Sequence, residues 1–350
     1  MKYAPQMRAI QFESFGGPLS IVETPMPVPH LHGVVIKVEA TGLCRSDWHA
    51  WMGHDSDIVL PHIPGHEFSG IVESVGKSVR KVAVGDRVVV PFVCGCGICE
   101  YCRSGNAQVC PNQTQPGFTH FGSFAQFVAI SGADFNVVKL PNEISFETGA
   151  SLGCRFATSF RALTKRANIQ PGETVAIFGC GGIGLSAIMI AKALGALVIA
   201  VDISGSALLK ARELGADYII NSSEVDAIHQ IQVITQDGVD ISVDALGSEE
   251  IASTAILSLK RRGRHLQLGL LPSASGRSAI PMARVIAYEL DVLGSHGMAA
   301  QDYPEMLELI VSGQLNPDLL IEKIVSLEEG VEGLANFGQL KSIGITIIKP

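Results

Sequence analysis

The chain has 350 residues, of which 47% are hydrophobic and 17% charged. This length exceeds one ordinary hydrophobic core and predicts two domains, and the balance excludes a disordered protein. The net charge of −8 argues against a general nucleic-acid or anionic-membrane binder. The first residues lack the apolar core of a signal peptide, so we expect a cytoplasmic protein.

Short strands and turns are predicted for the first third of the chain. Residues Val34–Ala40 alternate, with Lys37 and Glu39 on one side and apolar residues on the other. Gly70–Val75 and Arg87–Val90 are further strand candidates. Because proline and glycine are frequent before residue 120, we expect an irregular, β-rich lobe.

Four cysteines stand in a CxxCxxCx7C array, namely Cys96, Cys99, Cys102 and Cys110. Four thiolates without an open position are typical of a closed, structural zinc site. A disulfide interpretation would need an oxidising compartment, to which nothing in the sequence points. Cys94 breaks the spacing, so we do not count it as a ligand.

From about residue 156 the pattern changes to alternating strands and helices. The predicted strands are Thr174–Phe178, Leu197–Val201, Tyr218–Ile220, Asp240–Ala245, Arg264–Leu268 and Asp291–Gly294. Six strands with helical crossovers predict a doubly wound parallel sheet, and hence an α/β fold. The apolar run from 174 to 201 is long enough to span a bilayer, but Lys192 and five glycines favour a buried strand–helix–strand unit.

Two helices in the second half have predicted caps and apolar faces. Ser206 is the expected N-cap of one helix, whose apolar face carries Leu208, Leu209 and Leu214. The helix expected from Asp302 to Gly313 has an apolar face made of Met306, Leu307, Ile310 and Val311. The last predicted strand is Gly344–Lys349, so we expect the chain to return to the β-rich lobe.

The residues Gly179, Cys180, Gly181, Gly182, Ile183 and Gly184 fit the pattern GxGxxG. A β-branched strand runs into this turn and a helix begins within it, which is the context of a dinucleotide-binding fingerprint. The second strand ends on Asp202, 18 residues past Gly184. A carboxylate there favours the ribose hydroxyls of NAD and repels the 2′-phosphate of NADP. The alternative is that Asp202 only caps the following turn.

Three residues outside the array could hold a second metal, namely Cys44, His66 and Cys154. Two thiolates and one imidazole are a known catalytic zinc set that leaves the fourth position open. Each residue taken alone is more often core filler or a satisfied polar group. His62 could compete as a ligand, although the Gly65-His66-Glu67 context favours His66.

In combination, these motifs resemble the zinc-dependent alcohol dehydrogenases of the medium-chain dehydrogenase/reductase family. The resemblance rests on GHE at 65–67, Cys-x-Ser-Asp-x-x-His at 44–49, the cysteine array and GCGGIG, and it covers essentially the whole chain. It implies a GroES-like catalytic domain, residues 1–155 and 294–350, with a structural zinc lobe at about 92–112. It also implies a Rossmann NAD-binding domain, residues 156–293, with the active site in the cleft between the two.

The resemblance further implies a role for each matched residue. Cys44, His66 and Cys154 would hold the catalytic zinc, so that two zinc ions are expected per chain. The residues expected to serve catalysis around this metal are Asp47, which orients His66, Glu67 as an outer carboxylate, and Ser46 and His49 as a proton relay. The residues expected to contact NAD are Arg45, Thr158, Gly179, Gly181, Gly182, Ile183, Gly184, Asp202 and Leu270.

This set predicts interconversion of an alcohol with its aldehyde or ketone. Zinc lowers the pKa of a bound hydroxyl, hydride passes to the nicotinamide, and the relay carries the proton outward. Large residues that could line an apolar substrate pocket, or simply belong to the core, are Trp48, Trp51, Met52, Phe92, Phe118 and Leu270.

The chain departs from the family pattern near its last strand. Relatives commonly carry an arginine there that helps to bind the pyrophosphate, whereas this chain has Gly344-Ile345-Thr346, so the contact is missing or Lys341 replaces it. Relatives also place a lysine shortly after the ribose-binding Asp202, where Lys210 is too distant along its helix.

Other functions remain open at this point. The runner-up is a polyol or aldehyde dehydrogenase of the same family, although polyol enzymes often use a glutamate ligand in place of Cys154. A catalytically silent relative that binds zinc and nucleotide is a further alternative. A zinc-finger protein that binds nucleic acid is excluded by the charge and the Rossmann pattern. The resemblance also suggests a homotetramer.

Overall fold

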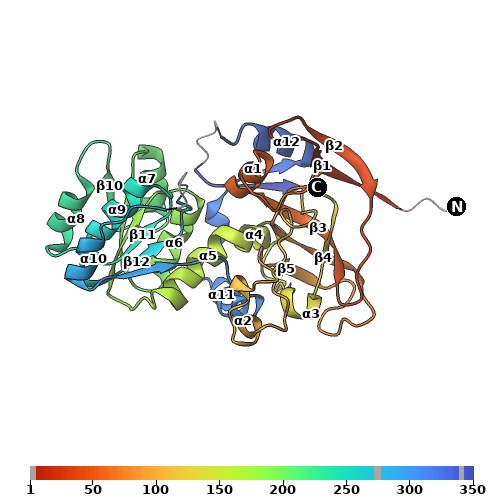
Figure 1. The fold of residues 1–350 in the computed structure, drawn as a ribbon, viewed down its shortest axis with the longest axis horizontal. Helices are drawn as coiled ribbons and strands as arrows, with labels where there is room; N and C mark the ends of the chain where they lie inside the picture. The colour runs from red at the N-terminus through yellow and green to blue at the C-terminus, as the bar shows by residue number, and fades with distance from the viewer. Residues whose placement is uncertain (1–4, 272–276, 339–342) are drawn as a thin grey trace. The chain divides into compact units, whose positions relative to one another are not determined.

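The computed structural model describes residues 5–271, 277–338 and 343–350, drawn as a ribbon in Figure 1. The chain divides into two compact units. The first unit contains Met1–Ala157, Gly297–Gly313 and Leu320–Pro350, and the second contains Thr158–His296 and Gln314–Leu319. The chain therefore leaves the first unit once, builds the second, and returns, apart from one short crossing near residue 314.

Two β-sheets organise the first unit. A seven-stranded sheet has the order β14-β15-β3-β4-β5-β7, with β6 paired to β3, and a separate two-stranded sheet pairs β1 with β2. The strands are β1 (Gln6–Phe12), β2 (Leu19–Pro25), β3 (Val34–Leu43), β4 (Glu67–Val75), β5 (Arg87–Val90), β6 (Phe127–Ile130), β7 (Val138–Lys139), β14 (Ile321–Ser326) and β15 (Ile345–Lys349).

Strand β3 is the central strand of this unit. Its sequence VVIKVEATGL buries all positions except Lys37 and the half-buried Glu39. The two charged residues follow the predicted alternation, but Val35 on the same side of the strand is fully buried. It pairs antiparallel with β4, and this register sets Gly42 opposite Glu67. The end of β3 and the start of β4 therefore bring the residues that follow Leu43 close to those around His66.

The helices of the first unit are short. They are α1 (Arg45–Trp51), α2 (Glu100–Arg103), α3 (Ala133–Asn136), α4 (Phe146–Ser151), α11 (Tyr303–Val311) and α12 (Leu327–Ala335). A π-helical turn, Leu152–Phe156, follows α4 and carries Cys154. Such wide turns inside helices often occur at functional sites, because they redirect one side chain without ending the helix.

The second unit is built on a six-stranded parallel sheet. Its order is β10-β9-β8-β11-β12-β13, so the strand order reverses between β8 and β11. The strands are β8 (Thr174–Phe178), β9 (Leu197–Asp202), β10 (Tyr218–Asn221), β11 (Val239–Asp244), β12 (Leu259–Gln267) and β13 (Asp291–Gly294). All six overlap the strands that the sequence predicted, although β12 begins five residues before the predicted start at Arg264. The doubly wound fold is confirmed.

Helices connect these strands. They are α5 (Ala157–Arg161), which continues the π-helical turn, followed by α6 (Gly182–Ala193), α7 (Gly205–Glu213), α8 (Ala227–Thr235), α9 (Glu249–Leu257) and α10 (Met282–Tyr288). The apolar run from 174 to 201 forms β8, α6 and β9, and most of its side chains are buried in the core of this unit. Among the described residues, no helix has the length and apolarity needed to cross a membrane.

Some local expectations were wrong. Ser204, not Ser206, caps α7, since its hydroxyl accepts the N–H of Ala207 and the helix starts two residues earlier than expected. Leu209 and Val311, which we assigned to apolar faces, are 60% and 47% exposed. Both helices are short, so a one-residue error in helical phase moves a side chain from the core to the surface.

Candidate functional site

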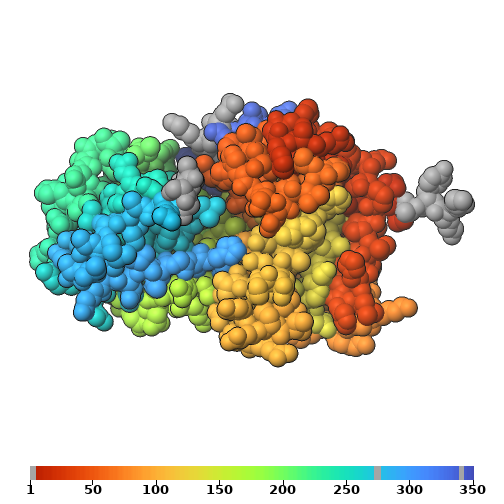
Figure 2. Space-filling view, viewed as in Figure 1, coloured from red at the N-terminus to blue at the C-terminus, as the bar shows by residue number. Residues whose placement is uncertain are grey.

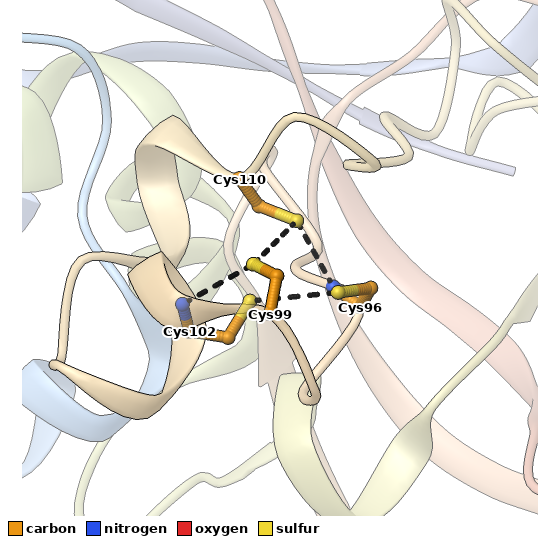
Figure 3. Close-up of side chains that lie close together, drawn as sticks. All are labelled: Cys96, Cys99, Cys102 and Cys110. Atoms are coloured by element: carbon orange, nitrogen blue, oxygen red, sulfur yellow. Dashed lines mark hydrogen bonds between the residues drawn. The ribbon is translucent and has the colours of Figure 1, made fainter.

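The four cysteines of the array converge on one point in the first unit. Figure 3 shows their sulfur atoms turned toward one another. The Sγ atoms of Cys96 and Cys102 lie 3.9 Å apart, and those of Cys99 and Cys110 lie 3.7 Å apart. Four sulfurs at about 2.3 Å from a tetrahedral zinc are separated by about 3.8 Å, so this spacing fits the ion.

Backbone groups of the lobe also favour thiolates. The N–H groups of Ile98 and Cys99 lower the pKa of Cys96 to about 6, whereas burial raises the pKa of Cys102 to about 12. The N–H of Cys96 and the N–H of Asn112 both point to Sγ of Cys110. Because a bound zinc requires all four thiolates, binding would release the protons that the cysteines still hold.

The lobe lies on the surface of its unit. The segment around it faces the viewer in the space-filling view (Figure 2), and Ile98 and Tyr101 are exposed. Its inner side packs against the returning chain, because Ala299 belongs to the same buried cluster as Cys102 and Cys110. The four-cysteine lobe is therefore a surface loop that packs against the C-terminal part of the unit.

Cys94 is not a member of the group. Its thiol lies 3.6 Å from the carbonyl oxygen of Pro91, and burial raises its pKa to about 12. It belongs to a buried hydrophobic cluster of the first unit, together with Val88 and Val90 of β5. This environment favours a protonated thiol, as expected for a structural cysteine.

A second group of possible ligands lies deeper in the same unit. It consists of Cys44, His66, Glu67 and Cys154, whose ligand atoms all lie within 4.8 Å of one another. Cys44 is the N-cap of α1, His66 directly precedes β4, and Cys154 comes from the π-helical turn. Three segments that are distant in sequence thus supply the two thiols and the imidazole.

One carboxylate orients this group. The Oδ1 atom of Asp47 lies 2.8 Å from Nδ1 of His66 and accepts the N–H of Gly65 at 3.0 Å, while Oδ2 accepts the N–H of Cys44 at 3.0 Å. Asp47 and His66 are fully buried. A carboxylate on Nδ1 fixes the tautomer that leaves Nε2 as the coordinating atom.

The donor set fits a zinc ion. Nε2 of His66 is buried and has no hydrogen-bond partner in the described chain, which is costly unless a ligand satisfies it. The thiol of Cys154 donates to the sulfur of Cys44, which lowers the pKa of Cys44 and raises that of Cys154. Two sulfurs and one nitrogen around an unsatisfied point match a catalytic zinc site with an open position.

Glu67 is engaged by Arg155, to which our sequence analysis assigned no role. Oε1 of Glu67 accepts the backbone N–H and the Nε–H of Arg155, both at 3.1 Å, and Oε2 pairs with Nη2 of Arg155. Glu67 is fully buried and Arg155 is 7% exposed. The fork of two parallel contacts is the strongest geometry available to a guanidinium and a carboxylate.

Two glycines leave room for this ion pair. A Cβ atom at Gly42 would lie 2.7 Å from Oε2 of Glu67, and one at Gly153 would lie 2.9 Å from Cα of Glu67. Ile345, at the position where our sequence analysis noted a missing arginine, has a buried side chain, and Lys341 lies outside the described residues. Arg155, next to a candidate ligand, provides a buried guanidinium close to the metal site.

Aromatic rings surround His66. The Phe118 and Phe92 rings lie 5.1 Å and 6.0 Å from its imidazole ring. Trp51, the last residue of α1, instead donates its indole N–H to the carbonyl of Gly17 and packs against the buried cluster that contains Phe12 and Ile58, so it anchors the end of the helix. Of the remaining residues considered for the pocket, Trp48 is half-buried, whereas Met52 and Leu270 are exposed.

The two residues expected to form the relay lie on α1. Oγ of Ser46 lies 3.8 Å from Sγ of Cys44. Nδ1 of His49 lies 2.8 Å from Nδ1 of His54, a partner that our sequence analysis did not consider. No hydrogen bond between Ser46 and His49 is described. Arg45, on the same helix, is exposed, with its guanidinium 6.0 Å from the ring of Phe337.

The glycine-rich turn of the second unit has the geometry of a phosphate-binding loop. Gly179 has a φ of +96°, and a Cβ atom at Gly184 would lie 1.7 Å from the carbonyl oxygen of Gly179. Around Gly181, by contrast, there is open space. The first and third glycines therefore close the turn against α6, and the second leaves the backbone accessible to a phosphate.

Asp202 ends β9 beside this turn. Its Oδ2 accepts the N–H of Cys180 at 2.6 Å, and its Oδ1 accepts the N–H of Ser204 at 2.8 Å. It therefore caps the following turn, as the alternative proposed, and at the same time braces the glycine-rich loop. A carboxylate has about four lone-pair sites, so these two bonds leave acceptor capacity for ribose hydroxyls.

The remaining residues expected to contact the coenzyme lie in the second unit. Ile183 belongs to the first turn of α6, and its carbonyl accepts the hydroxyl of Ser159 at 3.0 Å. Thr158 is buried on α5, one residue before Ser159. Leu270 follows β12 and is 79% exposed.

Comparison with known proteins assigns the family. Residues 30–142 match the alcohol dehydrogenase GroES-like domain, and residues 182–312 match the zinc-binding dehydrogenase domain. An alcohol dehydrogenase of Geobacillus stearothermophilus is 34% identical over 326 residues, which cover 92% of this chain and 94% of that protein. The chain belongs to the zinc-dependent alcohol dehydrogenases of the medium-chain dehydrogenase/reductase family.

Two further similarities agree with this zinc-dependent alcohol dehydrogenase family. A sorbitol dehydrogenase of Bacillus subtilis is 35% identical over 334 residues, with 92% of this chain and 91% of that protein covered. The crystal structure of an NAD-dependent alcohol dehydrogenase superposes with a TM-score of 0.90 at 29% identity, covering 98% of this chain and 100% of that one. The fold and family that the sequence predicted are confirmed.

The ion pair of Glu67 and Arg155 gives a prediction about stability. Replacing Arg155 by Leu leaves the Glu67 carboxylate buried and unpaired. We therefore expect the free energy of unfolding to be about 3–5 kcal/mol lower than in the parent. Denaturant unfolding of the zinc-loaded protein measures this loss. The double variant Glu67→Gln/Arg155→Leu is the matched control, and it should recover part of the stability. Equal stability of parent and Arg155→Leu would contradict the role of the pair.

Proposed function

We propose that this protein is an NAD(H)-dependent zinc oxidoreductase that interconverts an alcohol with its aldehyde or ketone. The observation that carries the proposal is the unsatisfied Nε2 of His66, which faces the sulfurs of Cys44 and Cys154. The glycine-rich turn with Asp202 in the same chain supports NAD as the hydride acceptor. The corresponding relatives include NAD-dependent alcohol dehydrogenases.

The protein's own residues would hold the metal and control its surroundings. Cys44, His66 and Cys154 would be the ligands, and Asp47 would keep the imidazole in the coordinating tautomer. When bound, zinc supplies a Lewis acid that lowers the pKa of the substrate hydroxyl, and NAD supplies the hydride acceptor. Arg155 neutralises Glu67, so that the carboxylate adds no uncompensated negative charge beside the two thiolates.

Proton movement would follow α1. In this proposal the Ser46 hydroxyl accepts the proton of the substrate as its own proton passes on toward the imidazole of His49. The 3.8 Å distance from Ser46 Oγ to Cys44 Sγ supports the first part, because it keeps the hydroxyl beside the proposed ligand set. Burial, followed by the charges of His54 and Arg45, lowers the pKa of His49, so that its imidazole is neutral and able to accept a proton at neutral pH.

The substrate would be an apolar primary or secondary alcohol. Phe92 and Phe118 border the His66 imidazole, and their rings offer no hydrogen bonds to the additional hydroxyls of a sugar alcohol. A polyol is the second candidate, because a sorbitol dehydrogenase is among the relatives. We also propose a catalytic domain of residues 1–155 and 294–350 and a coenzyme-binding domain of residues 156–293. A cytoplasmic location is proposed because the four cysteines of the array are free thiols, and a reducing compartment keeps thiols available for zinc.

A homotetramer is proposed as the working assembly. The edge strand β13 pairs only with β12 among the described strands, and Val292 on it is 40% exposed. This edge therefore offers unpaired backbone groups and the apolar side chain of Val292 to a second copy. Sedimentation equilibrium of the zinc-loaded protein measures the assembly, and a monomer at all concentrations would contradict it.

We expect two zinc ions per chain, one in each cluster. His66→Ala should retain one zinc and abolish turnover, whereas Cys102→Ala should lose the other zinc and lower the stability. Mass spectrometry of the metal content, with circular dichroism as a folding control, distinguishes these cases.

Turnover is measured with NAD and NADP on ethanol, 1-hexanol, benzyl alcohol and sorbitol. Normal turnover of His66→Ala, or a clear preference for NADP, would refute the proposal.

Replacing His49 by Gln tests the relay. We expect turnover to fall by roughly 10- to 100-fold, at or below the lower end of general acid–base effects. In the parent, activity in alcohol oxidation should fall at low pH as His49 becomes protonated, and its lowered pKa shifts this loss below the usual imidazole range. In the variant this dependence should disappear while the zinc content stays unchanged. A parent-like pH profile would remove His49 from the mechanism.

A further inference from the structure

The C-terminal end of α1 carries a pair of histidines in direct contact. Nδ1 of His49 and Nδ1 of His54 are 2.8 Å apart, so one ring nitrogen donates and the other accepts. The two ring centroids are 5.1 Å apart. His49 is half-buried and His54 is exposed, so the pair connects the interior of the unit to solvent.

The backbone at the end of α1 builds this contact. The N–H of His54 donates to the carbonyl of His49 at 3.0 Å, and the N–H of Gly53 donates to the carbonyl of Ala50 at 3.1 Å. These two bonds define a Schellman cap, which folds the chain back over the last helical turn. The contact that usually joins two apolar side chains in this motif is here a hydrogen bond between two imidazoles.

Two neighbours hold this turn in place. Gly53 has a φ of +77°, and a Cβ atom there would lie 2.8 Å from Cγ of Phe15, so glycine is required. The Trp48 ring meets His49 and His54 edge to face, with centroid distances of 5.0 Å and 5.8 Å. The indole therefore supports both imidazoles, and the pair is a constrained feature of the fold.

We infer that His54 is the outer member of the proton relay and passes protons between His49 and solvent. This inference rests on the proposed function, in which His49 receives the proton of the substrate. The titratable and charged groups that act on His49 are His54, Arg45 and Cys44. Because Arg45 and His54 both oppose a positive charge on His49, an imidazolium there is best relieved by transfer toward the exposed ring.

The transfer balances without any further reactant. A proton binds Nε2 of His49, the proton on Nδ1 of His49 moves to Nδ1 of His54, and Nε2 of His54 releases its proton to water. Both rings end neutral in the opposite tautomer, and exchange with water restores the starting tautomers. Carbonyl reduction uses the same path inward. The charge occupies one ring at a time, as expected for two imidazoles in contact.

The relay is tested with His54→Gln in the full-length, zinc-loaded protein. Glutamine can keep a hydrogen bond to His49 but cannot accept a proton and release another. The readout is the release of protons in a single turnover, followed with a pH indicator, using NAD and the best alcohol among ethanol, 1-hexanol and benzyl alcohol. We expect release to slow by about 3- to 10-fold, less than direct acid–base catalysis gives, because His49 keeps partial access to water. Added free imidazole should restore the rate.

A second measurement needs no substrate. Titration of the histidine ring protons by NMR in the zinc-loaded protein should show a higher pKa for His49 in His54→Gln, because the opposing charge of His54 is gone. His229→Gln, which changes an exposed histidine on α8, is the matched control and should leave both readouts unchanged. Unchanged proton release in His54→Gln would overturn the inference, even if the pKa of His49 rises.

The variant His49→Gln separates the two proposals. If His49→Gln slows proton release and His54→Gln does not, the relay through His49 stands and the role of His54 is refuted. If neither variant changes proton release, the relay itself fails, and with it the basis of this inference. Slower release in both variants, with imidazole rescue of His54→Gln, supports the path through the pair.

Discussion

The Asp47 carboxylate is the interaction on which the proposed active site depends. It accepts the backbone N–H groups of Cys44 and Gly65 and holds Nδ1 of His66, all inside a buried environment. One side chain therefore fixes the start of α1, the loop before β4 and the orientation of a ligand. Without it, two backbone donors would be left unsatisfied and the imidazole could rotate away from the sulfurs.

The buried charges around this carboxylate are balanced in pairs. Glu67 is matched by Arg155, and two thiolates would be matched by a divalent cation. Such an arrangement is stable only as a whole, since removal of one partner leaves the other charge buried and unpaired. The guanidinium comes from the residue after Cys154, so the same π-helical turn supplies both a ligand and the counterion of Glu67.

Local spacing explains what the sequence could predict. The cysteine array, the glycine-rich turn and the six parallel strands are patterns within short segments, and each of them lies where expected. The ion pair of Glu67 with Arg155 joins residues far apart in the chain, and no spacing rule indicates it. The contact of His49 with His54 depends on the positive φ of Gly53, which a sequence pattern suggests only as a turn. The exposed Leu209 shows that short helices leave the phase of a pattern uncertain.

The two groups of candidate metal ligands differ in how much of the chain must fold before each can form. All four cysteines of the cage lie between residues 96 and 110, so a short loop is sufficient to close it. The other set draws on residues 44, 66 and 154, and it requires β3, β4 and the turn after α4 to be assembled. During synthesis the four cysteines would therefore be able to bind the proposed zinc ion early, whereas the deeper group would bind its ion only after the domain has folded.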